Sequence, residues 1–231
     1  MPFHSFTPGP AAGENNISGV PVRKIKKFKI PVYTYDIARR CKKNGLNLDL
    51  IGLGAERDFK EYVSLLAAAL EPSVVFDYFP PDDKDMSVIG SDSGSPPPAT
   101  IGMLTLGKTF AGRMASEKEE IRRQINITAA ASFLQAAVKV ITDLATQEAS
   151  PEGFVLSKPF FIYSNPDINV HEAEKNSSGE YEIPLYRDEL MAKLAKRLEA
   201  EKIGIFLNDG MLTPEYSCVF LLEWLIKQKR K

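Results

Sequence analysis

One stretch of this chain carries an unbroken helical pattern that any fold of it must accommodate. From Ile121 to Ala145, apolar residues recur at every fourth position, and neighbouring alanines keep the helix surface flat enough for close approach. The preceding Ser116-Glu117-Lys118-Glu119 matches the capping box that begins helices. A helix of about seven turns with so broad an apolar stripe belongs inside a protein, so we expect it to be the central core helix.

Shorter patterns surround this helix and mix strands with helices. Apolar runs predict strands at 46–53, 74–79, 99–106, 159–163 and 203–207, and spaced apolar residues predict helices at 56–70 and 186–199. Thr213-Pro214-Glu215 has the cap, first-turn proline and acid of a helix start, so we expect a last helix after it. Because strands and helices do not alternate strictly, the pattern favours an α+β, helix-rich domain over a doubly wound sheet.

Composition sets the domain boundaries. With 231 residues of which 44% are hydrophobic, the chain can bury one substantial core, and we assign it to residues 22–231. Residues 1–21 are rich in Pro, Gly, Ser and Asn and predict a disordered N-terminal arm. Two further stretches, 80–98 and 165–179, are too polar to pack and predict long loops.

Neither the cysteines nor the apolar segments point to secretion. Cys41 and Cys218 are far apart and fit no zinc or disulfide spacing, so we expect free, buried thiols in a reducing compartment. No signal-peptide pattern begins the chain, and no window approaches a membrane span. We therefore expect a soluble intracellular protein.

The net charge of −1 conceals a strong segregation. Residues 22–43 contain a single acid, Asp36, whereas residues 44–226 hold 16 basic and 28 acidic side chains. The basic side chains of the first segment are Arg23, Lys24, Lys26, Lys27, Lys29, Arg39, Arg40, Lys42 and Lys43. Such asymmetry is typical of a surface for nucleic acid or anionic lipid, or of attraction between subunits.

The first half of this basic segment predicts an edge strand over 24–35, because apolar residues and lysines alternate and Pro31 excludes a central position. Alternation places Lys24, Lys26 and Phe28 on one face, where the lysines meet phosphates and the ring inserts or stacks. The competing interpretation is an edge strand that lysine protects from aggregation. Asp36 then predicts the cap of a short basic helix that ends at Asn44-Gly45.

A rival chemistry comes from residues 102–109, which match the phosphate-binding pattern G-x-x-x-x-G-K-[ST]. In that alternative the chain is a nucleotide-binding enzyme, and Gly102, Gly107, Lys108 and Thr109 hold phosphates and magnesium. The competing interpretation is that 99–106 is a strand that Gly107 ends, with Lys108 exposed. His4 and His171 lie in polar segments, and no residues form a recognisable catalytic or metal-binding set, so we expect no enzyme activity and no cofactor.

The run Val32-Tyr33-Thr34-Tyr35-Asp36, followed by Ile51-Gly52, Phe59 and Leu65-Leu66, resembles the early core of rhabdovirus matrix proteins over about 40 residues. The Pro-Pro-x-Tyr motif of some of these proteins is absent, and the arm is not lysine-rich. The resemblance implies a viral structural protein that self-assembles and binds membrane or nucleocapsid. Together with the charge pattern, it predicts a non-enzymatic protein that contacts its neighbours through the arm and an anionic partner through the basic segment.

Overall fold

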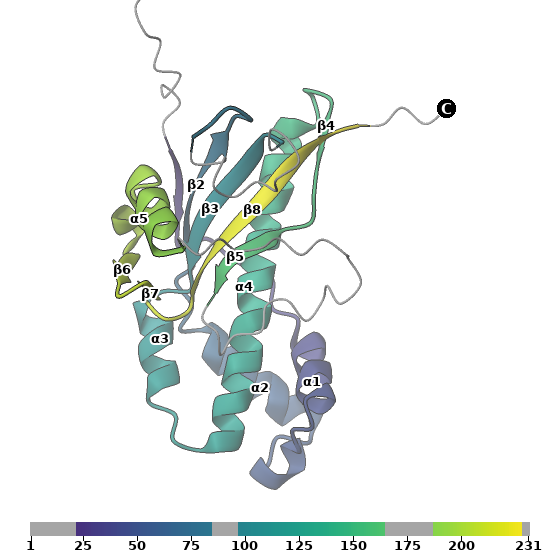
Figure 1. Cartoon of the computed structure of the whole chain (residues 1–231). Helices are drawn as coiled ribbons and strands as arrows, with labels where there is room; N and C mark the ends of the chain where they lie inside the picture. The colour runs from purple at the N-terminus through teal and green to yellow at the C-terminus, as the bar shows by residue number, and fades with distance from the viewer. Residues whose placement is uncertain (1–21, 85–96, 165–186, 228–231) are drawn as a thin grey trace, which may run out of the picture.

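In the computed structural model, which describes residues 22–84, 97–164 and 187–227, helices cover both faces of one antiparallel sheet (Figure 1). The order across the sheet is β1-β2-β3-β8, and β5 and β4 pair with successive parts of the far edge of β8. The strands are β1 (Arg23–Lys26), β2 (Ser73–Phe79), β3 (Ala99–Thr105), β4 (Phe154–Leu156), β5 (Phe160–Ser164) and β8 (Ser217–Ile226). The α+β class is therefore confirmed. The predicted arm and most of the two predicted polar loops lie outside the described residues.

The central strand β8 stands where the sequence predicts a last helix, and that prediction is wrong. Residues 217–222 are buried, between β3 on one edge and β5 on the other. A short apolar run buried on all sides has no period that separates strand from helix. The aromatic and β-branched residues Val219, Phe220 and Trp224 suit a strand, and they outweigh the helix-start signal of Thr213-Pro214-Glu215.

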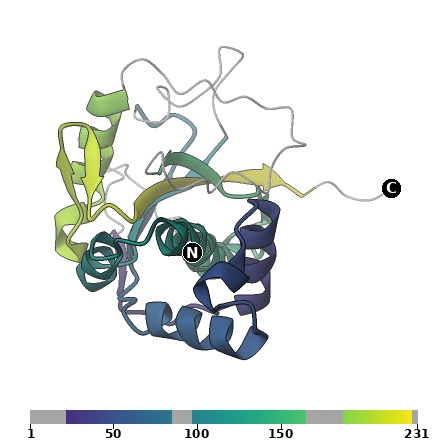
Figure 2. The same cartoon turned by 90° about the horizontal axis from the view of Figure 1, so that it is seen from below.

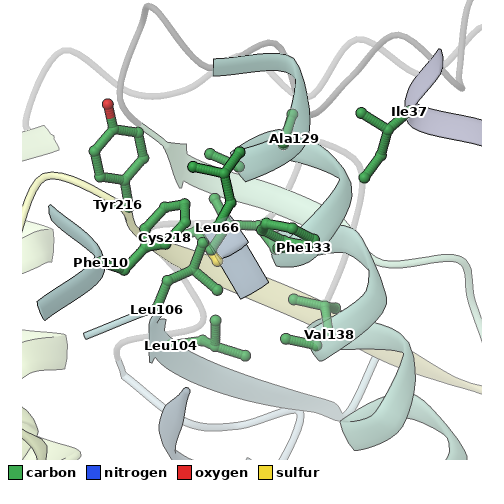
Figure 3. Packing of buried hydrophobic residues seen from close by; sticks show 14 of the residues in the cluster. Ile37, Leu66, Leu104, Leu106, Phe110, Ala129, Phe133, Val138, Tyr216 and Cys218 are labelled. Atoms are coloured by element: carbon green, nitrogen blue, oxygen red, sulfur yellow. The ribbon is translucent and has the colours of Figure 1, made fainter. Parts of the chain in front are cut away.

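The predicted core helix is confirmed as α4 (Glu120–Ala149), which packs on one face of the sheet. Phe133 and Val138 of α4 lie over Leu104 and Cys218 of the sheet (Figure 3). Three shorter helices complete this layer: α1 (Thr34–Lys43), α2 (Glu56–Ala67) and α3 (Lys108–Ala115). The predicted capping box does not form, because Ser116 ends α3 and donates to the Arg113 carbonyl oxygen.

Helix α4 is also long and apolar enough to cross a membrane, contrary to the expectation that no segment is. Most of its apolar window is buried against other parts of the fold. Its neighbours include α1, β3, β4 and β8. Length and composition alone do not distinguish a core helix from a membrane span, and in this fold α4 is the core helix.

The other face of the sheet is covered by α5 (Arg187–Arg197), the 3-10 helix η3 (Ala200–Ile203) and the hairpin of β6 (Phe206–Asn208) and β7 (Met211–Thr213). Leu190, Leu194 and Leu198 pack there against the sheet, which confirms the predicted helix. The guanidinium of Arg197 lies 3.7 Å from the centre of the Phe79 ring and donates to Asp83 at 2.7 Å. This layer is thereby fixed to β2 and the loop after it.

Two predicted strands need correction. The strand predicted at 203–207 begins only at Phe206, because Ala200–Ile203 form η3, and the strand predicted at 46–53 is wrong. Residues Leu48–Ile51 form a 3-10 helix, η1, which joins α1 to α2. The Asn47 side chain accepts a hydrogen bond from the Asp49 backbone N–H at 3.1 Å, and Gly52 takes a left-handed conformation after the last turn. These local bonds favour a tight turn over an extended chain. As a result α1, η1 and α2 form a compact unit beside α4.

Candidate basic interface

The basic residues predicted as one surface lie in two separate groups. Figure 2 shows β1 and α1 on opposite sides of α4, joined by the segment 27–33. The β1 group comprises Arg23, Lys24, Lys26 and Lys27, and the α1 group comprises Arg39, Arg40, Lys42 and Lys43. Lys29 is exposed in the connecting segment.

The β1 group lies on the predicted edge strand, which pairs only with β2 among the described strands. The strand ends at Lys26 and not at Tyr35, because Lys27 has a positive φ of 51°. That turn interrupts the alternation, so Phe28 packs against the core beside Ile25. The predicted placement of Phe28 with Lys24 and Lys26 is therefore wrong, and its ring is partly buried.

Acidic residues of the protein already pair with part of the β1 group. Arg23 forms an ion pair with Glu148 of α4, and its guanidinium lies over the Phe76 ring. The Lys27 Nζ donates to Glu71 Oε1 at 2.7 Å. Glu71 also accepts from the Thr109 hydroxyl at 2.9 Å, and these two hydrogen bonds lower the pKa of its carboxyl. A hollow of about 220 Å³ next to Lys26 and Lys27 is thus already lined by an acidic side chain of the protein, Glu71.

The α1 group projects from a helix whose opposite side is buried. Ile37 and Cys41 are fully buried in the core, and the Arg40 Nη2 donates to Gln135 Oε1 of α4 at 2.6 Å. Asp36 lies in the first turn and is not the N-cap, which is Tyr33, so the predicted cap is wrong. The predicted end at Asn44-Gly45 is confirmed.

The exposed side of α1 carries two lysines that have no ion-pair partner among the described residues. Within the described part of the chain, Lys42 and Lys43 form no ion pair, and the guanidinium of Arg39 reaches Asp36 only at 3.5 Å. Lys24, Lys26 and Lys29 likewise form none there. The cleft beside the α1 group is larger than the hollow beside the β1 group.

This cleft has a volume of about 550 Å³ and opens between α1, η1 and α2. Its apolar lining is Val32, Ala38, Leu48, Leu53 and Phe59, and its polar and charged lining is Thr34, Tyr35, Arg39, Lys42, Glu56 and Lys60. The Tyr35 side chain is 79% exposed at the rim. Basic side chains outnumber acids on the rim, and the floor is apolar. Sequence reasoning missed the cleft because three elements form it together, one of them incorrectly predicted as a strand.

Residues 102–109 do not have the geometry of a phosphate loop. Gly102 lies inside β3, where a Cβ atom would come within 2.4 Å of the Phe220 ring, so glycine is needed for packing. The segment from Gly102 to Thr105 pairs with β2 and β8 and cannot wrap a ligand. Gly107 has a positive φ and precedes α3, Lys108 extends over the Phe206 ring, and Thr109 bonds Glu71. The competing interpretation of a strand ended by Gly107, with Lys108 exposed, is confirmed.

The two thiols of the chain are shielded from solvent. Cys41 and Cys218 are free and buried, as predicted. Burial raises the pKa of the Cys41 thiol to about 11 and also raises that of Cys218. In the described ranges, no cluster of histidine, cysteine and acidic side chains is placed to hold a metal ion.

No protein-family model matches this chain, and no curated protein matches it.

Proposed function

We propose that this protein is a non-enzymatic structural protein of the viral matrix type, which self-associates and binds a phosphate-bearing partner through the α1 face. The observation that supports the proposal is the cleft between α1 and α2, whose apolar floor is bordered by Arg39, Lys42 and Lys60. Among the described residues the two lysines form no ion pair, and Arg39 pairs with Asp36 at 3.5 Å. Lysine and arginine without protein partners are available to an external anion. The exposed Tyr35 adds an aromatic surface to the same rim.

The chemistry of this face suits phosphate groups, whether they belong to a lipid or to a nucleic acid. Arg39, Lys42 and Lys60 provide positive charge, and Glu56 is the one acid in the cleft lining. Anionic headgroups attract such clusters with about 1 kcal/mol for each lysine or arginine near the surface. Nucleic acid phosphates attract the same side chains, and bases stack on tyrosine rings. Either partner would place the protein inside a cell, in host cytoplasm and virion if it is viral.

The α1 face is tested by charge reversal with a matched control. The triple variant Arg39→Glu, Lys42→Glu, Lys43→Glu is compared with Lys24→Glu, Lys26→Glu of β1. Flotation with phosphatidylserine vesicles and a gel shift with single-stranded RNA identify the source of the phosphate. We expect the triple variant to lose at least about a hundredfold in affinity for one of the two. Equal losses in both variants, or binding that does not respond to salt, would contradict the proposal.

Self-association through residues 1–21 forms the second part of the proposal, and those residues lie outside the described structure. It rests on their composition and on the opposed charges of residues 22–43 and 44–226. Light scattering of the full chain and of a variant without residues 1–21 tests it. We expect the full chain to assemble in a salt-sensitive manner and the shortened chain to remain monomeric. A full chain that stays monomeric at every salt concentration would disprove it.

A further inference from the structure

The end of β8 reaches beyond the rest of the sheet. On the β3 side its backbone contacts end at Trp224, whose N–H donates to the Pro98 carbonyl at 2.7 Å, whereas β4 pairs with residues 224–226. The end of the β4–β8 pair is therefore a two-stranded ribbon at one end of the sheet (Figure 1). Lys227 continues the contact, because its backbone N–H donates to the Gly153 carbonyl at 3.1 Å.

This β4–β8 ribbon has a rigid base. Trp224 is 6% exposed, and its indole N–H donates to the Thr100 hydroxyl at 2.9 Å. The Trp224 ring packs edge-to-face on Tyr78 at 5.0 Å and on Phe154 at 5.7 Å. Because the tryptophan is fixed to β2, β3 and β4, the residues that follow it are held in one orientation.

Beyond this base the ribbon carries exposed aliphatic side chains on both faces. Val155 and Leu225 form a cross-strand pair on one face, and each is about two-fifths exposed. Ile226 on the other face is 80% exposed. Exposed aliphatic side chains at a projecting tip are unfavourable in water, and contact with a partner would bury them.

A basic run follows the apolar tip directly. Lys227 is succeeded in the sequence by Gln228, Lys229, Arg230 and Lys231. In the sequence, these residues add four positive charges immediately after the tip. The nearby acids on the ribbon are Glu152 and Glu223, fewer than the cations of the run.

We propose that the β4–β8 ribbon inserts Val155, Leu225 and Ile226 into the interface of an anionic membrane. Apolar insertion and a basic run are the two signals that together give stable attachment to anionic lipid. A second copy of the chain fits less well, because a symmetric contact at this tip would bring two basic runs together. Nucleic acid would use the charges and leave Ile226 in water. The surface is separate from the α1 cleft and does not depend on its function.

The experiment uses the single tryptophan of the chain, Trp224, as a reporter at the base of the tip. Full-length protein is mixed with vesicles of phosphatidylcholine, with or without phosphatidylserine, in which the phosphatidylcholine carries bromine atoms on its acyl chains. We expect bromine to quench Trp224 emission in phosphatidylserine vesicles and not in neutral ones. Ile226→Asp should weaken this binding at least about tenfold, and replacing Lys229, Arg230 and Lys231 by glutamine should weaken it about fivefold for each charge.

Met211→Asp is the matched control, because Met211 is an exposed apolar residue of β7, outside the ribbon. It should bind and quench as the wild type does. Vesicle binding without quenching of Trp224 would overturn the proposal, since another face would then contact the lipid. Oligomers that Ile226→Asp dissociates, without any lipid quenching, would also overturn it and identify the tip as a contact between copies. The α1 triple variant tells the two proposals apart. If it binds vesicles more weakly but Trp224 is still quenched in the bound fraction, the ribbon proposal is supported and the change in affinity concerns the α1 proposal alone.

Discussion

The β1 group and the α1 group have similar composition, yet the fold uses them differently. In the β1 group, Arg23 and Lys27 pair with Glu148 and Glu71 and attach an edge strand to its neighbours. In the α1 group, Lys42 and Lys43 are exposed and form no ion pair among the described residues. Each group also keeps lysines without an ion pair among the described residues, so a basic run can indicate a binding surface only at the positions whose charge the protein does not already balance.

The two groups also differ in how they are held. Helix α1 is attached by its buried side, through Ile37 and Cys41 in the core and Arg40 on α4. Strand β1 is attached mainly by its pairing with β2, and Ile25 beneath it is only partly buried. A helix can therefore bury one side and present a row of cations on the other. In β1, by contrast, alternate residues contribute to the fold.

The largest expected effect concerns the attachment of α1. Ile37→Ala should lower the free energy of unfolding by about 2–4 kcal/mol, because it leaves a cavity in the core. Ile25→Ala should cost about half as much, since part of that side chain already contacts water. Urea unfolding followed by circular dichroism measures both. Equal losses in the free energy of unfolding would show that α1 and β1 are anchored alike.

The next effect tests whether α1 detaches from the fold independently of the sheet. Burial raises the pKa of Cys41 from 9.0 to about 11, so the folded thiol forms about a hundredfold less thiolate near pH 8. We expect Cys41 and Cys218 to react with a thiol reagent only on global unfolding, with mass spectrometry assigning each site. Faster labelling of Cys41 than of Cys218 would show local release of α1 and would make the α1 face a movable element.

Long periodic elements of this fold could be predicted from the sequence, and elements that depend on tertiary partners could not. The spacing from Ile121 to Ala145 determines α4, because one stripe must face the sheet. Strand β2 follows from its apolar run and flanking prolines. The run of β8 is apolar on every side, so only its pairing with β3 and β5 decides that it is a strand. The pattern Thr213-Pro214-Glu215 predicted a helix wrongly, because a local helix-capping pattern stabilises less than pairing with two strands.

The candidate site shows the same division. The basic side chains were visible in the sequence, whereas their separation into two groups depends on the turn at Lys27 and the path around α4. The α1 cleft needed the 3-10 turn at η1, which brings Leu48 and Leu53 beside Phe59. The β4–β8 ribbon was hidden because β8 itself was predicted as a helix. Ion pairs such as Arg23 with Glu148 join residues too distant in sequence for any local pattern to reveal.

A smaller effect separates the cations that pair from those that do not. Arg23→Ala removes the ion pair with Glu148 and the contact with Phe76, and should cost about 1 kcal/mol of folding free energy, since both partners are partly exposed. Lys43→Ala should change it by less than about 0.5 kcal/mol. Thermal unfolding compares the two variants at low and high salt, and salt should reduce the difference. A cost for Lys43→Ala as large as that for Arg23→Ala would mean that the α1 group is also structural.

The smallest expected effect is the pH dependence of the β1 group. Hydrogen bonds from Lys27 and Thr109 lower the pKa of Glu71 below its ordinary value of 4.5. A carboxyl whose pKa is lower in the folded state stabilises the fold above its unfolded pKa, and this contribution disappears as the pH falls through the folded pKa. The wild type should therefore lose more stability below pH 4.5 than Glu71→Gln does. Urea midpoints at neutral and acidic pH measure the difference. Identical pH profiles would show that Glu71 is not bound to Lys27 in solution, which would leave Lys27 as free as Lys42 and Lys43 of α1.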